Sequence, residues 1–309
     1  MSLFKFFPKD DDLIEKIFIR DGFCAVKCTL PQDYNDPYEL FLGLDTSVET
    51  QDLAFYYDVI QKIPQIPTTC FSRSLLSLPM WAHYASNHAG YVIEFDLEVL
   101  QQHFAEASIK DVKYISEPDK NIAEILKMAS RIGKPRYLGF LYETVRYNAY
   151  FSKYKEWSYE QECRFVATGD CIEKIGINDL LFIPIEAIKS IVLGKNISDS
   201  NKTKLLEISE KYNIKVYYLN ISKTSSSPFF TDLDNRSYIF DKKEIILAHK
   251  VCKECPQPLS NTESETCEIC SITEAHRQDA ANRNAFRMLA HYNLLDDYIE
   301  GFREISKNR

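Results

Sequence analysis

Residues 80–96 read MWAHYASNHAGYVIEFD, and this stretch contains both kinds of element that the fold requires. Residues 80–88 have helical spacing, and Gly90 is expected to end that helix. Residues 91–96 are aromatic and β-branched, which is typical of a strand. A helix therefore leads directly into a strand here, and the same mixture is expected on both sides of it.

Short strands and helices continue outward without the regular strand–helix alternation of a doubly wound sheet, so the sequence predicts an α+β fold. A loop with four serines and a proline, residues 222–228, predicts a domain boundary. We expect an α+β catalytic domain over 1–221, a connecting segment over 222–250 and a small module over 251–309. The expected strands are 4–7, 23–30, 68–72, 91–96, 162–167, 188–193 and 214–219, and the expected helices are 13–19, 80–88, 118–151 with a break near Gly133, and 199–212.

The composition restricts the possible partners and compartments. The chain of 309 residues has a net charge of −8, so a nucleic-acid partner has to meet a local basic patch. No run of about 18 apolar residues and no secretory apolar segment is present, which predicts no membrane partner. Nine cysteines, an odd number with two tight pairs, suit a reducing compartment, so a cytoplasmic location is expected.

The two tight pairs are C-x-x-C knuckles separated by eleven residues. This spacing brings four thiolates around one tetrahedral Zn²⁺ and leaves no open coordination position, which predicts a structural site rather than a catalytic one. The loop between the pairs is acidic, so we expect the module to contact a protein, such as an antitoxin or a chaperone, rather than DNA. Residues 274–305 have the spacing of a terminal amphipathic helix. The predicted zinc ligands are Cys252, Cys255, Cys267 and Cys270.

Four polar clusters lie at element boundaries in the large domain, at residues 34–39, 70–74, 80–85 and 155–164. The first contains Asn-Asp-Pro, which turn chemistry explains without any function. The third contains His83, and a single histidine is more often structural than catalytic. These clusters are candidate site residues, each with an ordinary structural alternative.

The fourth cluster has the strongest chemical pattern. If residues 160–166 are extended, Glu160, Glu162 and Arg164 line one face of a strand. Two carboxylates beside a guanidinium could stabilise a developing cation while Arg164 fixes a carboxylate. The alternative is a solvated strand face with a surface ion pair.

Together the clusters resemble a bacterial domain-of-unknown-function family, over about residues 1–220. The family pattern has a Lys-aromatic opening strand, an Asn-Asp-Pro-aromatic-Glu turn, a Cys-Phe-Ser strand, a Met-Trp-x-His-Tyr helix and Trp-x-x-Glu-x-Glu-x-Arg. The matching segments here are 4–6, 35–39, 70–72, 80–84 and 157–164. This resemblance names no activity.

The order of elements also resembles, more distantly, the ADP-ribosyltransferase fold of bacterial toxins that modify nucleic acid. That likeness implies a mixed sheet with helices, with Glu162 as the catalytic glutamate and Glu160 as its upstream partner. Ser72 takes the middle-strand position, and Lys5 stands where the family has His or Arg. The residues that the resemblance places around the substrate NAD are Lys5, Asn35, Phe71, Ser72, Trp81, Tyr84 and Arg164.

The chemistry of that family would be cleavage of the nicotinamide–ribose bond through an oxocarbenium-like state. Glu162 would stabilise the positive charge, and Glu160 or His83 would take a proton from the acceptor. The leading expectation is therefore an NAD-dependent ADP-ribosyltransferase, an anti-phage or toxin–antitoxin effector that modifies nucleic acid or protein. The alternatives are a zinc-stabilised, non-enzymatic binding or adaptor protein and a hydrolytic, nuclease-like enzyme. The nuclease-like alternative is the weaker one, because the sequence of the large domain contains no compact Asp/Glu/His metal motif.

Overall fold

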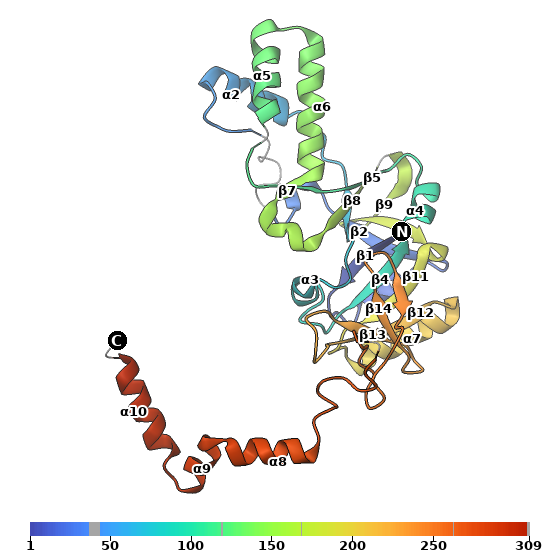
Figure 1. The fold of residues 1–309 in the computed structure, drawn as a ribbon. Coiled ribbons are helices and arrows are strands. Elements are labelled where there is room, and N and C mark those ends of the chain that lie inside the picture. The colour runs from blue at the N-terminus through green and yellow to red at the C-terminus, as the bar shows by residue number, and fades with distance from the viewer. Residues whose placement is uncertain (37–43, 119, 168, 262, 308–309) are drawn as a thin grey trace. The chain divides into compact units, whose positions relative to one another are not determined.

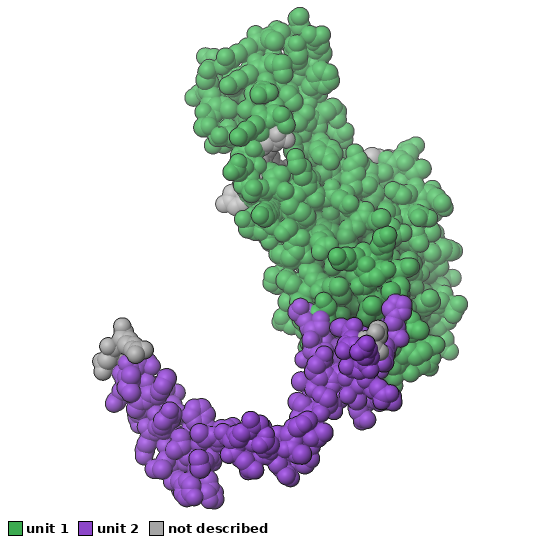
Figure 2. All heavy atoms as spheres, viewed as in Figure 1, with its two compact units in different colours: residues 1–221, 227–247 green, residues 222–226, 248–309 purple. Residues whose placement is uncertain are grey.

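A computed structural model describes residues 1–309 except 37–43, 119, 168, 262 and 308–309. The chain divides into two compact units, each of which is described by itself (Figure 2). The first unit comprises residues 1–221 and 227–247, and the second comprises residues 222–226 and 248–309.

The first unit is built on a sheet of ten strands in the order β15-β14-β13-β12-β11-β4-β1-β3-β8-β5 (Figure 1). Neighbouring strands are antiparallel, apart from the parallel pair β11 and β12. Two smaller sheets, β2-β10-β9 and β6-β7, accompany it. The strands are β1 (Ser2–Phe7), β2 (Phe23–Cys28), β3 (Thr68–Ser72), β4 (Tyr91–Asp96), β5 (Ser108–Asp111), β6 (Lys113–Ile115), β7 (Ser152–Tyr154), β8 (Glu162–Val166), β9 (Ile172–Ile175), β10 (Asn178–Pro184), β11 (Ile188–Leu193), β12 (Lys215–Asn220), β13 (Phe229–Thr231), β14 (Ser237–Phe240) and β15 (Ile245–Leu247).

Three of the helices, α2, α5 and α6, form a separate layer with its own core. The strongly amphipathic α5 buries Ile122, Leu126 and Ala129, which recur at helical spacing, against α2 and α6. Figure 1 shows α5 and α6 running side by side. The helices of this unit are α1 (Leu13–Ile17), α2 (Thr50–Ile60), α3 (Leu78–His83), α4 (Leu97–His103), α5 (Lys120–Ile132), α6 (Pro135–Phe151) and α7 (Asp199–Tyr212), with short 3₁₀ turns η1 (Pro31–Asp33), η2 (Lys155–Glu160), η3 (Gly169–Cys171) and η4 (Ile185–Ala187).

The α+β prediction is confirmed, whereas the helix expected over 80–88 is shorter than predicted. Helix α3 ends at His83, because residues 86–88 all have positive φ and form a tight turn. Gly90 then lets this turn approach β1 closely. A Cβ at Gly90 would lie 2.0 Å from the carbonyl oxygen of Phe7, so only glycine fits without a backbone shift.

Residues 227–247 differ from the expected connecting segment, since they form β13, β14 and β15 and extend the large sheet. The physical reason is apolar burial. Phe230 and Phe240 pack into a core with Phe4 and Trp81, and the rings of Phe4 and Phe240 meet edge-on with centroids 5.3 Å apart. The boundary therefore falls on both sides of these strands rather than before them.

The second unit contains the cysteine knuckles and three helices, α8 (Glu274–Arg283), α9 (Ala285–His291) and α10 (Leu295–Lys307). The single terminal helix that was expected is interrupted at Asn284, which caps α9, and at Asn293, whose φ is +56°. Several apolar side chains of these helices are exposed, including Phe286, Tyr292 and Phe302. Among the described residues, no helix combines the length and apolarity that crossing a membrane requires.

Candidate functional site

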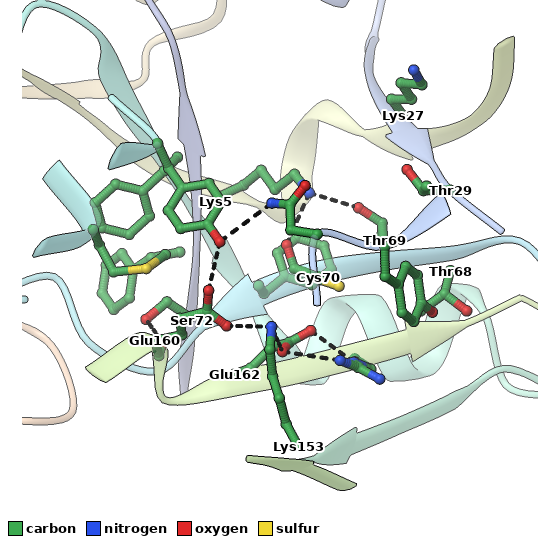
Figure 3. A pocket seen from close by; sticks show the side chains of 18 of the residues that line it. Lys5, Lys27, Thr29, Thr68, Thr69, Cys70, Ser72, Lys153, Glu160 and Glu162 are labelled. Atoms are coloured by element: carbon green, nitrogen blue, oxygen red, sulfur yellow. Dashed lines mark hydrogen bonds and ion pairs between the residues drawn. The ribbon is translucent and has the colours of Figure 1, made fainter. Parts of the chain in front are cut away.

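The candidate site is a cavity of about 210 Å³ between β1 and β3. These two strands share one registered pair, Phe4 with Ser72, whereas β1 pairs with β4 along its whole length. Figure 3 shows Lys5 of β1, Cys70 of β3 and Glu162 of β8 around this space. The lining residues are Phe4, Lys5, Phe6, Lys27, Thr29, Asp33, Tyr34, Asn35, Thr68, Thr69, Cys70, Phe71, Ser72, Met80, Tyr84, Lys153, Glu160, Glu162 and Arg164.

Lys5 spans the separation between the two strands. Its Nζ donates hydrogen bonds of 2.9 Å to both Thr69 Oγ1 and the Cys70 carbonyl oxygen on β3. Burial lowers the pKa of the Lys5 amine, which weakens its hold on its proton. Lys5, one of the predicted site residues, is thus a lining residue of the cavity.

A nearly buried set of four charges forms another wall of the cavity (Figure 3). Lys153 Nζ lies 2.7 Å from Glu160 Oε2 and 3.2 Å from Glu162 Oε2. Arg164 holds Glu162 with two bonds, 2.7 Å from Nε and 3.2 Å from its terminal nitrogen. The four side chains are at most 6% exposed, so their pairing is screened little by solvent. We call Lys153, Glu160, Glu162 and Arg164 the charged quartet.

The two carboxylates of the quartet have opposite pKa shifts. Burial raises the pKa of Glu162, but the charges of Arg164 and Lys153 outweigh it and lower that pKa to about 2. For Glu160 burial prevails over Lys153, and the charge of Glu162 adds to it, so the pKa is raised. Tyr84, whose own pKa burial raises, donates a 2.5 Å hydrogen bond from its hydroxyl to Glu160 Oε1. The environment thus separates a firmly ionised carboxylate from one that holds a proton more readily.

A local backbone feature places both glutamates on the cavity, and the extended conformation considered for residues 160–166 begins only at Glu162. The 3₁₀ turn η2 carries Glu160, and Gln161 takes a left-handed conformation with φ +44° before β8 begins at Glu162. Ser72 then anchors the turn, because its hydroxyl donates a 2.6 Å bond to the Glu160 carbonyl oxygen. Arg164 follows Glu162 at strand spacing on the same face, as predicted.

Two predicted residues lie outside the cavity lining. Helix α3 and its end direct Met80 and Tyr84, one helical turn apart, into the cavity. His83 is exposed, with its Nδ1 3.4 Å from the Tyr159 hydroxyl. Trp81 is fully buried and donates from Nε1 to the Leu75 carbonyl oxygen at 2.9 Å. The structure therefore places neither His83 nor Trp81 against a ligand in this cavity.

The remaining predicted residues line the cavity. Phe71 is 2% exposed and packs edge-on against Phe95, with ring centroids 5.6 Å apart. Asn35 Nδ2 lies 3.5 Å from the Tyr84 hydroxyl. Residues 37–39 of the same turn, part of the expected motif, lie outside the described residues. Sequence reasoning missed Lys153, because one lysine in a short strand after a long helix carries no motif.

The four predicted zinc ligands meet in the second unit. Their ligand atoms all lie within 4.8 Å of one another, and sulfur–sulfur distances are 3.9 Å for Cys255–Cys267 and 3.6 Å for Cys255–Cys270. Four thiolates 2.3 Å from a tetrahedral zinc would be about 3.8 Å apart, so the group could hold such a metal. The backbone N–H groups of Glu254 and Cys267 also donate to Cys252 Sγ, which favours its thiolate.

A family model described as "Protein of unknown function (DUF2971)" matches residues 80–165. The matched segment contains all four members of the charged quartet, together with most of α3 and of β8. It confirms the likeness to a domain-of-unknown-function family. No curated protein and no solved structure matches the chain.

Proposed function

We propose that the chain is an NAD-dependent ADP-ribosyltransferase that works at this cavity and transfers ADP-ribose to nucleic acid. The observation that carries the proposal is the pair Glu160 and Glu162 on one cavity wall, with pKa values shifted in opposite directions. Glycosyl transfer requires one permanently charged carboxylate and one that exchanges a proton, and the pair meets both requirements.

The reaction assigns a separate step to each glutamate. The bond between the nicotinamide nitrogen and ribose C1 breaks with its electron pair leaving on nicotinamide, and positive charge develops on the ribose. The ionised Glu162, oriented side-on by Arg164, would stabilise that charge. Glu160 would take the proton from the acceptor as the acceptor's nucleophile forms the new bond to C1. The products are ADP-ribosylated acceptor, nicotinamide and one proton.

The cavity size fits one end of the substrate. A cavity of about 150 Å³ accepts a benzene ring, so about 210 Å³ accommodates a ring with part of an adjoining sugar. The aromatic rings of Tyr34 and Tyr84 line it and could stack on nicotinamide. The ADP part of NAD would then extend out of this cavity past Lys27, an exposed residue of its lining.

We further propose that the cysteine group of the second unit binds Zn²⁺ as a structural ion. All four tetrahedral positions would be taken by thiolates, which leaves none for a substrate or water. In the described part of the chain, the cysteines form the one group of three or more potential metal ligands. This favours the transferase over a metal-dependent hydrolase.

The test is nicotinamide release and label transfer from NAD carrying separate labels on nicotinamide and adenosine. The acceptors are single-stranded DNA, RNA and cell-lysate protein, in separate reactions. Glu160→Gln and Glu162→Gln should each lower nicotinamide release at least about 100-fold, as expected for loss of an acid–base or electrostatic group. Glu156→Gln, an exposed glutamate on the same 3₁₀ turn, should leave it unchanged.

The same experiment separates the alternatives. Absence of release and transfer with every acceptor, from protein shown to be folded, would refute the transferase and favour the adaptor. Cleavage of nucleic acid that needs a divalent metal would favour the hydrolase. As an effector, the wild-type chain should also arrest growth of cells that express it, while Glu162→Gln should not.

A further inference from the structure

A second feature of the first unit lies on α5 and α6, outside the lining of the candidate cavity. Residues 120–151 contain six lysines and arginines against two glutamates, a net charge of +4 in a chain whose total is −8. The same residues include six tyrosines and phenylalanines. Positive charge interleaved with aromatic rings is the composition that single-stranded nucleic-acid sites use. Such a local basic patch is what a nucleic-acid partner of an acidic chain would need, although one of its cations, Arg131, pairs with Glu49 and Asp52.

One end of this patch contains a groove of about 420 Å³, twice the volume of the candidate active-site cavity. Lys110 Nζ lies 5.4 Å from the ring centroid of Tyr147 and 5.5 Å from that of Phe151. Tyr147 is 44% exposed, so its ring is accessible to a stacking partner. We call this feature the α6 groove, with Lys110, Thr144, Arg146, Tyr147, Tyr150 and Phe151 among its lining residues.

The charges around the α6 groove favour an anion. Lys110 and Arg146 line it together with one acid, Glu143, which pairs with Arg146 at 2.7 Å. Both side chains of that ion pair are well exposed, so the pair is weak and a phosphate can replace Glu143 beside Arg146. Lys110 is exposed and its amine faces the rings of Tyr147 and Phe151.

A second exposed ring continues the feature along the same helix. Phe140 is 61% exposed and lies seven residues before Tyr147, so both rings share one face of α6 about 10 Å apart. Arg136 lies one turn earlier, with its guanidinium over the ring of Tyr137 at 4.7 Å. Successive rings with flanking cations match successive bases and phosphates of one strand.

The α6 groove adjoins the candidate active site. Lys110 on β5 is registered opposite Arg164 of the charged quartet on β8. Arg164 also donates a 2.9 Å bond to the carbonyl oxygen of Tyr150, a residue that lines the groove. A nucleic-acid strand bound in the groove would therefore run beside the cavity wall that holds Glu162.

We propose that the α6 groove and the adjoining face of α6 bind single-stranded nucleic acid. Bases stack on Tyr147 and Phe140, and phosphates contact Lys110 and Arg146. Unpaired bases are required, because the rings can stack only on bases that are not paired in a duplex. An acidic peptide would satisfy the cations but would leave the exposed rings unused. This inference deepens the proposed function by making the strand the acceptor, yet binding itself requires no NAD.

The test is fluorescence anisotropy with the full chain and no NAD. The labelled probes are a 20-nucleotide single-stranded DNA, the RNA of the same sequence, the corresponding DNA duplex and an acidic peptide. The wild type should bind the single strands at least tenfold more tightly than the duplex or the peptide. Tyr147→Ala should weaken single-strand binding about tenfold, the effect of one lost stacked base. Lys110→Ala should reduce the slope of log affinity against log salt by about 0.7, one phosphate contact.

The matched controls are Tyr292→Ala, an exposed tyrosine of the second unit, and Lys174→Ala, an exposed lysine on β9, and both should bind as the wild type does. Single-strand binding that survives Tyr147→Ala and Lys110→Ala unchanged would overturn the inference, as would equal binding of the peptide. The outcomes stay separable from those of the proposed function. Binding without NAD turnover would refute only the transferase, and NAD turnover without single-strand binding would refute only the groove.

Discussion

Replacing Lys153 with methionine tests whether the charged quartet is a coupled unit. The substitution keeps the length and apolar stem of the side chain and removes the cation that lies between Glu160 and Glu162. Glu162 keeps its two bonds from Arg164. The carboxylate of Glu160 is then left with the hydrogen bond from Tyr84. The removal of the lysine cation therefore affects mainly Glu160.

The magnitude follows from the burial of the pair. Breaking a buried ion pair by removing one partner costs about 3–5 kcal/mol, and both side chains here are 6% exposed. In the variant, burial and Glu162 both raise the pKa of Glu160 with no lysine to oppose them, so the pKa of this carboxyl lies higher than in the wild type. We expect a loss of about 3 kcal/mol at pH 7, near the lower end of that range.

The direction of the pH dependence is also set. A carboxyl whose pKa in the folded state lies above its unfolded value of about 4.3 destabilises the fold as pH rises from the lower to the higher of these two values. The free energy of unfolding then falls by up to about 1.4 kcal/mol per pH unit. The deficit of Lys153→Met relative to wild type should therefore be small at pH 5 and grow toward pH 8. Adding Glu160→Gln, which leaves no charge to desolvate, should recover at least half of the loss.

The assay is urea unfolding followed by tryptophan fluorescence between pH 5 and pH 8. Both tryptophans, Trp81 and Trp157, belong to the first unit, so the signal reports that unit alone. Lys155→Met, an exposed lysine two residues away, is the matched control and should change stability by less than about 0.5 kcal/mol. A loss below about 1 kcal/mol for Lys153→Met, or no recovery in the double variant, would refute the coupled quartet.

Three further predictions use the same purified chain. In urea unfolding, Gly90→Ala should destabilise the first unit by about 1–3 kcal/mol, because the added Cβ would meet the Phe7 carbonyl oxygen. Gly139→Ala in α6 should instead stabilise it by about 0.5–1 kcal/mol, because an added Cβ there has no atom within 4 Å. In acid titration, the stability that Glu162 contributes is present above its unfolded pKa and is lost as pH falls toward about 2, so Glu162→Gln should flatten the acid limb. Native mass spectrometry should find one Zn²⁺ per chain; Cys267→Ser should lose it and the second unit's fold while the tryptophan signal of the first unit stays unchanged.

Local patterns in the sequence were sufficient wherever the chemistry depends on neighbours along the chain. The knuckle spacing predicts four thiolates around one ion, since each pair needs only a short turn to present both sulfurs. The break near Gly133 between two helices appears as α5 and α6. The spacing of Glu162 and Arg164 predicts a shared strand face, because side chains alternate strictly along an extended chain.

Other features depend on contacts between distant segments and could not be read locally. Residues 227–247 looked like a linker, but their aromatic side chains complete a core that the first strand began, and strand pairing is a property of both partners. His83 and Trp81 belong to a plausible motif, yet the direction of each side chain on α3 places one in solvent and the other in the core.

The sequence by itself determined the α+β class, the cluster of four cysteines that could hold a metal, and the strand that carries Glu162 and Arg164, because periodicity and spacing record what each residue does with its near neighbours. Only the tertiary structure decided that β1 and β3 separate to leave a cavity and that Lys153 comes to lie between two glutamates from other elements. It also decided that the α6 groove lies beside that cavity. Burial and charge pairing act through space, and they set the pKa values on which the proposed chemistry depends.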